Sequence, residues 1–144
     1  MTVYLDASAL VKLYVAEPGS AEVADLLSRA EAAVTAVITR VEVAAALARA
    51  ARLGRVGQAE AARALEAFGT DWANLVRVRI TEDLIARAAS LAWEHGLRGY
   101  DAVHLAAALV FSEASGEELL LATYDRNLGE AARKAGLKVW PEDG

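Results

Sequence analysis

The first residues of the chain place a carboxylate directly after a short apolar segment. Thr2–Leu5 is β-branched, aromatic or aliphatic, without the alternation of apolar and polar residues that marks a strand with one wet face. Asp6 follows, and residues 7–16 carry helix-forming residues with an apolar face. A strand buried on both faces is typical of a parallel sheet, whose ligands bind beyond the carboxyl ends of the strands. Asp6 is therefore either a helix cap or a functional group at that edge.

Segments of the same kind recur along the chain and alternate with helical segments. The expected strands are residues 2–5, 32–36, 75–80, 119–122 and 137–140. The expected helices are residues 7–16, 20–30, 38–53, 57–73, 81–95, 100–114 and 126–135. This alternation predicts an α/β fold, a parallel sheet with helices on both faces. Arg77 and Arg79 on one face place the third strand at an edge, and Ser20 and Thr81 are expected to cap the helices that begin there.

Length and composition limit the class of protein. The 144 residues suffice for one core, and no internal repeat or linker is visible, so we predict a single domain over residues 1–144. The absence of Cys excludes a disulfide framework and a zinc–thiolate site. No uncharged stretch reaches the ~18 residues of a membrane span, and the chain opens on a strand rather than a signal peptide. We therefore expect a cytoplasmic protein without membrane contact.

Four acidic residues stand out because of where they lie. Asp6 and Asp125 each follow an apolar strand, while Glu42 and Asp101 lie near the starts of apolar helices. Each has a simpler explanation: helix caps for Asp6 and Asp125, a first-turn acid for Asp101, and the wet edge of a helix for Glu42. The net charge of −5 is not that of a general nucleic-acid binder. The acids form either a solvated surface or a site that converges on a cation.

Taken jointly, the four acids favour a cation site. The parallel topology brings them to one rim of the sheet, where crowded carboxylates repel one another and lose hydration. A divalent cation offsets that cost. Oxygen ligands without a cluster of His or Cys point to Mg²⁺ or Mn²⁺ rather than zinc. We therefore predict that Asp6, Glu42, Asp101 and Asp125 hold Mg²⁺ or Mn²⁺.

Four segments of the chain, in order, carry a family resemblance. They are LDASALVKLY at residues 5–14, Glu42 in its Ala/Val-rich helix, YDAVHLA at residues 100–106 and TYDRNL at residues 123–128. Together they resemble the PIN-domain family, and within it the VapC-type toxins of bacterial and archaeal toxin–antitoxin pairs. The resemblance implies a three-layer α/β/α sandwich with a mainly parallel sheet of about five strands. It also implies a metal-dependent ribonuclease with an RNA substrate, a cognate antitoxin and a homodimeric state.

The resemblance also implies that the four acids are catalytic. Asp6 and Asp101 are expected to be direct metal ligands, and Glu42 and Asp125 are expected to bind a second ion or to orient metal-bound water. Two other functions remain open. One is a PIN-fold module that binds RNA or protein without cutting. The other is a phosphotransfer enzyme with Asp6 as nucleophile, against which Ser8 counts because it stands where such enzymes usually carry a second acid.

Three further residues near the acids have open roles. Ser8 either hydrogen-bonds a pocket acid or phosphate or belongs to the start of its helix. His104 lies three residues after Asp101 and either faces the pocket or serves packing and hydrogen bonding, which we favour. Arg126 is either a phosphate contact or, as we favour, an exposed surface residue.

Overall fold

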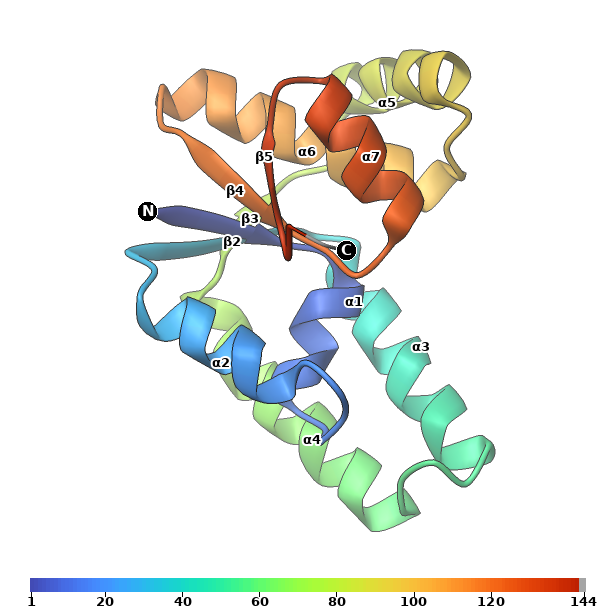
Figure 1. Ribbon diagram of the computed structural model, residues 1–144. Coiled ribbons are helices and arrows are strands. Elements are labelled where there is room, and N and C mark those ends of the chain that lie inside the picture. Colours follow the sequence, from blue (N-terminus) through green and yellow to red (C-terminus); the bar gives the residue numbers. More distant parts are fainter. Residues whose placement is uncertain (143–144) are drawn as a thin grey trace.

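The sheet is parallel throughout and has β1 at its centre (Figure 1). The computed structural model describes residues 1–142, so the last two residues of the predicted domain, 143–144, lie outside the described part. Within residues 1–142 the strands run in the order β3-β2-β1-β4-β5. They are β1 Thr2–Leu5, β2 Ala32–Ala36, β3 Val76–Val78, β4 Leu119–Ala122 and β5 Lys138–Trp140. Because β1 pairs with both β2 and β4, the residue that follows it lies in the middle of the sheet's carboxyl edge.

Helices cover both faces of this sheet, so the predicted three-layer α/β/α sandwich is confirmed (Figure 1). One layer contains α1 Ala7–Leu10, α2 Ser20–Ser28, α3 Thr39–Arg52 and α4 Gln58–Asp71, with the 3₁₀ turns η1 Val11–Leu13 and η2 Trp72–Asn74. The other layer contains α5 Glu82–His95, α6 Gly99–Ser115 and α7 Arg126–Lys134. No helix of residues 1–142 is both long and apolar enough to span a bilayer.

The side chains of β1 divide between two hydrophobic clusters. Val3 and Leu5 pack with the layer that contains α2, α3 and α4, whereas Tyr4 packs with the layer of α5, α6 and α7. Successive side chains of a strand point to opposite faces of the sheet, so one short strand reaches both clusters. All four residues of β1 are buried, which confirms the expected strand buried on both faces.

Several predicted bounds differ from those of the structure. The predicted helix 7–16 ends at Leu10, and η1 continues the chain to Leu13. The loop after it folds back, because the Lys12 amino group donates a hydrogen bond to the Pro18 carbonyl over 2.7 Å. Strand β3 is shorter than the predicted segment 75–80, but it is an edge strand as predicted.

The two predicted helix caps have different outcomes. The Thr81 hydroxyl accepts a hydrogen bond from the Leu84 N–H over 3.1 Å, as expected for a cap of α5. The predicted cap at Ser20 is wrong. Its hydroxyl donates to the Val15 carbonyl and accepts from the Glu17 N–H, while Gly19 occupies the N-cap position of α2. Gly19 adopts a left-handed conformation with φ of 96°, which disfavours any residue with a Cβ.

Gly19 offers a test of how tightly the loop before α2 packs against Tyr124. A Cβ at Gly19 would lie 2.7 Å from the Tyr124 hydroxyl oxygen, whereas a Cβ at Gly54, which is also left-handed, meets no heavy atom of the described residues within 4 Å. Both Gly→Ala changes carry the left-handed cost of about 1–2 kcal/mol. We expect Gly19→Ala to lower the melting temperature more than Gly54→Ala does. Equal losses in thermal unfolding would show that the Tyr124 contact adds nothing.

Candidate active site

Asp6 is a buried carboxylate that accepts three hydrogen bonds at the end of β1. The Ala9 N–H donates to Oδ1 over 3.1 Å, so Asp6 does cap α1. The hydroxyl of Ser8 donates to the same oxygen over 2.7 Å, and the hydroxyl of Thr123 donates to Oδ2 over 2.6 Å. Burial raises the pKa of Asp6, although the three hydrogen-bond donors act in the opposite direction. Asp6 is therefore a helix cap and also a desolvated carboxylate, and Ser8 bonds one of the four acids.

Thr123 connects Asp6 to Asp125. It is the first residue after β4, and its hydroxyl accepts a hydrogen bond from the Asp125 backbone N–H over 3.0 Å. The Asp125 carboxylate in turn accepts from the Leu128 N–H over 2.9 Å and caps α7. One hydroxyl therefore ties the residues that follow two neighbouring parallel strands.

Arg98 holds the next two acids together. Its Nε lies 3.1 Å from Oδ2 of Asp101, and its Nη2 lies 2.7 Å from Oδ2 of Asp125. Asp101 is buried in the first turn of α6, whereas the Arg98 side chain is 75% exposed. Burial raises the pKa of Asp101, the negative charge of Asp125 adds to this effect, and Arg98 opposes it. The guanidinium thus offsets a repulsion between two carboxylates.

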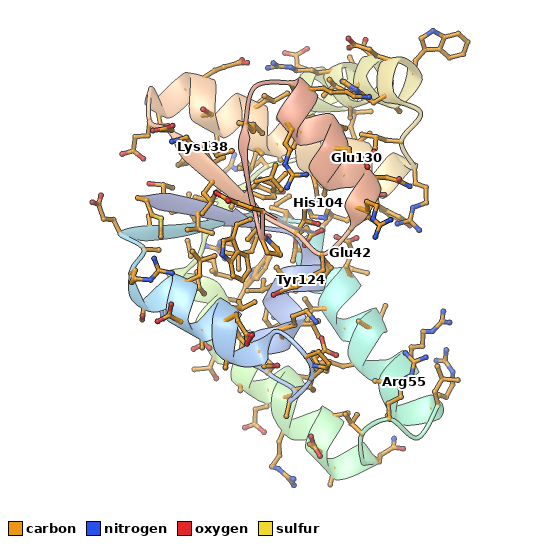
Figure 2. The ribbon with its side chains drawn as sticks, in the orientation of Figure 1. Glu42, Arg55, His104, Tyr124, Glu130 and Lys138 are labelled. Atoms are coloured by element: carbon orange, nitrogen blue, oxygen red, sulfur yellow. The ribbon has the colours of Figure 1, made fainter. Side chains whose placement is uncertain are left out.

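Glu42 reaches the same region from the opposite helical layer. Its Oε1 lies 2.6 Å from Nε2 of His104, and Nδ1 of His104 lies 2.8 Å from the Tyr4 hydroxyl. Figure 2 shows Glu42 of α3 and His104 of α6 meeting at the edge of the sheet. His104 therefore has the hydrogen-bonding role favoured from the sequence. Arg126 is exposed, as expected.

Hydrogen bonds join three of the four predicted acids. Thr123 joins Asp6 to the backbone N–H of Asp125, and Arg98 joins Asp125 to Asp101, while Glu42 lies at the same edge of the sheet and is bonded to His104. The four acids come from the ends of β1 and β4 and the first turns of α3 and α6. The parallel sheet thus gathers the acids at its carboxyl edge.

The chemistry of these side chains fits a hard divalent cation. The four carboxylates supply only oxygen donors, which suit Mg²⁺ and Mn²⁺. As the side chains stand, however, no group of three or more His, Cys, Asp or Glu in residues 1–142 is arranged to hold a metal ion. The reason is visible in the contacts: N–H groups of Arg98 and His104 engage carboxylate oxygens of Asp101, Asp125 and Glu42. An ion at these acids would share or replace those bonds.

Sequence reasoning did not identify Thr123, Arg98 or Tyr4 as parts of the site. Thr123 carries a usable signal, because it follows β4 directly just as Asp6 follows β1. Arg98 also carries one, because a basic residue three positions before Asp101 can pair with it at a helix start. The Tyr4 hydroxyl carries no such signal, since its partner lies 100 residues further along the chain.

Fold and site together define a class: parallel α/β domains with a carboxylate cluster at the carboxyl ends of the strands. The sequence profile of the PIN domain matches residues 3–134, and the chain belongs to the PIN domain family. It is 40% identical over 139 residues to Ribonuclease VapC49 of Mycobacterium tuberculosis, which covers 96% of this chain and 94% of that protein.

Two solved structures show the same fold at lower sequence identity. The first is Mycobacterium tuberculosis VapC20, described as a toxin that cleaves the sarcin–ricin loop. It aligns with a TM-score of 0.68 at 18% identity and covers 94% of this chain and 95% of that one. A toxin–antitoxin complex from Klebsiella pneumoniae aligns with a TM-score of 0.56 at 18% identity and covers 82% and 83%.

The raised pKa of Asp101 predicts a pH-dependent cost to stability. Because the folded protein holds the carboxyl proton more tightly than the unfolded chain, wild-type stability falls as the pH rises from the usual carboxyl pKa of about 4 through the higher folded value. Asp101→Asn removes this titration. With chelator present, the variant should match the wild type near pH 4 and melt a few degrees higher at pH 7. Thermal unfolding across this pH range measures the difference, and a variant that is less stable at pH 7 contradicts the argument.

Proposed function

We propose that this protein is a divalent-metal-dependent endoribonuclease and the toxin of a toxin–antitoxin pair. The observation that carries the proposal is that four acids, Asp6, Glu42, Asp101 and Asp125, lie at the carboxyl edge of the sheet. The 40% identity to Ribonuclease VapC49 over 96% of the chain supports RNA as the substrate. We also propose that residues 1–144 work as one ribonuclease domain and that it acts in the cytoplasm, where its RNA substrate lies.

The proposed chemistry assigns a role to each acid. Asp6 and Asp101, the two buried carboxylates, would hold Mg²⁺ or Mn²⁺ directly, and Glu42 and Asp125 would bind a second ion or orient water. A divalent cation so held supplies a Lewis acid for a phosphate oxygen, an activated water, and charge stabilisation at the leaving oxygen. Ser8 and Thr123 keep Asp6 oriented through their hydroxyl donors. The ionised carboxylates would accept hydrogen bonds from the water that attacks phosphorus.

Arg98 is expected to compete with the divalent metal ion for Asp101 and Asp125. Its positive charge pairs with both Asp101 and Asp125. Because the Arg98 side chain is exposed, it would move into solvent if these two ion pairs broke. A guanidinium released beside the site matches the geometry of a phosphate oxygen pair. Arg98 would therefore exchange carboxylate partners for the phosphate of the RNA.

The antitoxin and the homodimer each have a candidate surface. Apolar side chains of η1 and α3 line a groove, to which Val11, Val15 and Ala50 contribute, and an amphipathic antitoxin helix would fit such a surface. A second apolar groove lies between α5 and the start of α6, with Ile85 and Tyr100 exposed at it. We propose the first for the antitoxin and the second for a homodimer, and the Klebsiella pneumoniae complex supports an antitoxin partner.

Cleavage of RNA tests the proposed catalysis. Purified protein, free of antitoxin, should cleave members of a broad RNA panel with Mg²⁺ or Mn²⁺ and stop when chelator is added. Asp101→Asn should lower cleavage by at least about 100-fold, because loss of an outer-shell partner alone costs 10–100-fold at a metal site. Glu113→Gln is the matched control, since Glu113 is an exposed acid of the same helix that pairs with Arg87.

The outcomes separate the competing functions. Folded, antitoxin-free protein that leaves the panel intact but binds RNA would favour a non-catalytic PIN module. A phosphorylated enzyme intermediate at Asp6 would favour the phosphotransfer alternative, which the ribonuclease proposal excludes.

Binding of Mn²⁺ tests the proposed role of Arg98. Arg98→Met should bind Mn²⁺ roughly tenfold more tightly in calorimetry, because the guanidinium no longer competes with the ion. Tenfold corresponds to ~1.4 kcal/mol of binding free energy. Without metal it should be less stable than the wild type, because Asp101 and Asp125 lose their shared cation. Arg87→Met is the control, since Arg87 pairs with Glu113 away from the site. Weaker Mn²⁺ binding by Arg98→Met would remove Arg98 as a competitor.

A further inference from the structure

Two hydrogen bonds link three side chains, each from a different layer of the fold. Tyr4 lies in β1, His104 in the layer of α6, and Glu42 in the opposite layer, on α3. Tyr4 is fully buried, and His104 is 2% exposed. The two rings pack edge to face, with centroids 5.9 Å apart and an interplanar angle of 74°. Only the last member, the Glu42 carboxylate, reaches solvent, with its side chain 23% exposed.

The hydrogens of this chain can be assigned by counting donors and acceptors. The phenol of Tyr4 keeps its proton at neutral pH, because a phenol ordinarily titrates at about pH 10 and a fully buried phenolate would lose its hydration. That hydroxyl hydrogen needs an acceptor, and Nδ1 of His104 lies 2.8 Å away. If Nδ1 carried a hydrogen, the two hydrogens would face each other. Nδ1 is therefore the acceptor, and the ring hydrogen lies on Nε2.

This assignment fixes the direction of the next bond. Nε2–H of His104 donates to Oε1 of the Glu42 carboxyl group over a short distance of 2.6 Å. The donor is held by two buried rings that cannot rotate without losing the Tyr4 bond. Glu42 has several rotatable bonds, so a fixed donor removes freedom that an otherwise half-exposed glutamate would keep. Every buried polar side-chain atom of residues 1–142 has a hydrogen-bond partner, so Tyr4 and His104 are both satisfied by this arrangement.

We propose that Tyr4 and His104 are positioning residues for Glu42: the Tyr4 hydroxyl fixes the imidazole as its Nε2–H tautomer, and this N–H holds the carboxylate at the acidic pocket. The tautomer and the hold on Glu42 follow from the geometry alone. Their consequence for metal binding rests on the proposed function, because outer-shell hydrogen bonds orient carboxylates that ligate metals.

The test is Tyr4→Phe in the full-length protein, which removes one oxygen and keeps the ring in the core. Tyr14→Phe is the matched control, since the Tyr14 hydroxyl donates over 2.9 Å to Asp71 at the end of α4, which is not one of the four acids. Long-range ¹H–¹⁵N spectra with chelator should show a single Nε2–H tautomer of His104 in the wild type and in Tyr14→Phe. Tyr4→Phe should show a mixture that includes the Nδ1–H form.

Calorimetry with Mn²⁺ gives the second readout. Tyr4→Phe should weaken Mn²⁺ binding about tenfold, the lower end of outer-shell effects, and Tyr14→Phe should leave it unchanged. His104→Gln, which keeps an N–H donor toward Glu42, should retain more Mn²⁺ affinity than His104→Leu. Equal affinity of these two variants would show a purely structural role and overturn the proposal.

The two readouts separate this proposal from the proposed function. A wild-type protein with the Nδ1–H tautomer, or a Tyr4→Phe variant with an unchanged tautomer, overturns the positioning role. If the wild type binds no Mn²⁺ yet Tyr4→Phe alters the tautomer, the metal site fails while the positioning of Glu42 is supported.

Discussion

The buried carboxylate of Asp6 is the constraint on which this molecule depends. Taking a carboxylate out of water is costly unless donors satisfy it. Here the donors come from Ala9 and Ser8 just after it and from Thr123, 117 residues further along the chain. Satisfying Asp6 therefore requires β4 beside β1, and that pairing also brings Asp125 and Asp101 to the same edge. The central strand and the site are parts of one arrangement.

The charges around Asp6 are balanced rather than merely crowded. The net charge of −5 and the four pocket acids suggested strong repulsion. In the folded protein, the Arg98 guanidinium bonds both Asp101 and Asp125, which offsets part of that repulsion, and His104 bonds Glu42. What remains is largely desolvation, which is the first cause of the raised pKa of both Asp6 and Asp101. The site is thus a pocket in which a cationic side chain already bonds oxygens of two of the four acids.

Much of this arrangement could be predicted from the sequence because it follows from local patterns. The apolar strands 2–5, 32–36 and 119–122 have the predicted bounds, and the four acids identified by their neighbours lie at the carboxyl edge of the sheet, as predicted. The bounds that failed depend on contacts between distant elements. The helix after Asp6 stops at Leu10 where a loop folds back onto Lys12, and Ser20 bonds Val15 and Glu17 instead of its own helix. The partners of Tyr4 and Thr123 lie too far along the chain for a local pattern to reveal them.

The three-layer path from Tyr4 through His104 to Glu42, together with the Thr123–Asp6 bond, has a consequence for how the protein is made. Ribosomes deliver the chain from its amino end, so Asp6 and Glu42 emerge long before His104 and Thr123 do. A nascent chain that carries only β1 to α4 lacks Thr123 as the third donor to Asp6, His104 as the partner of Glu42, and β4 as a neighbour of β1. Such a chain has Asp6 and Glu42 but not their arrangement. The four acids can therefore lie together only after most of the chain, including Asp101 and Asp125, has been made.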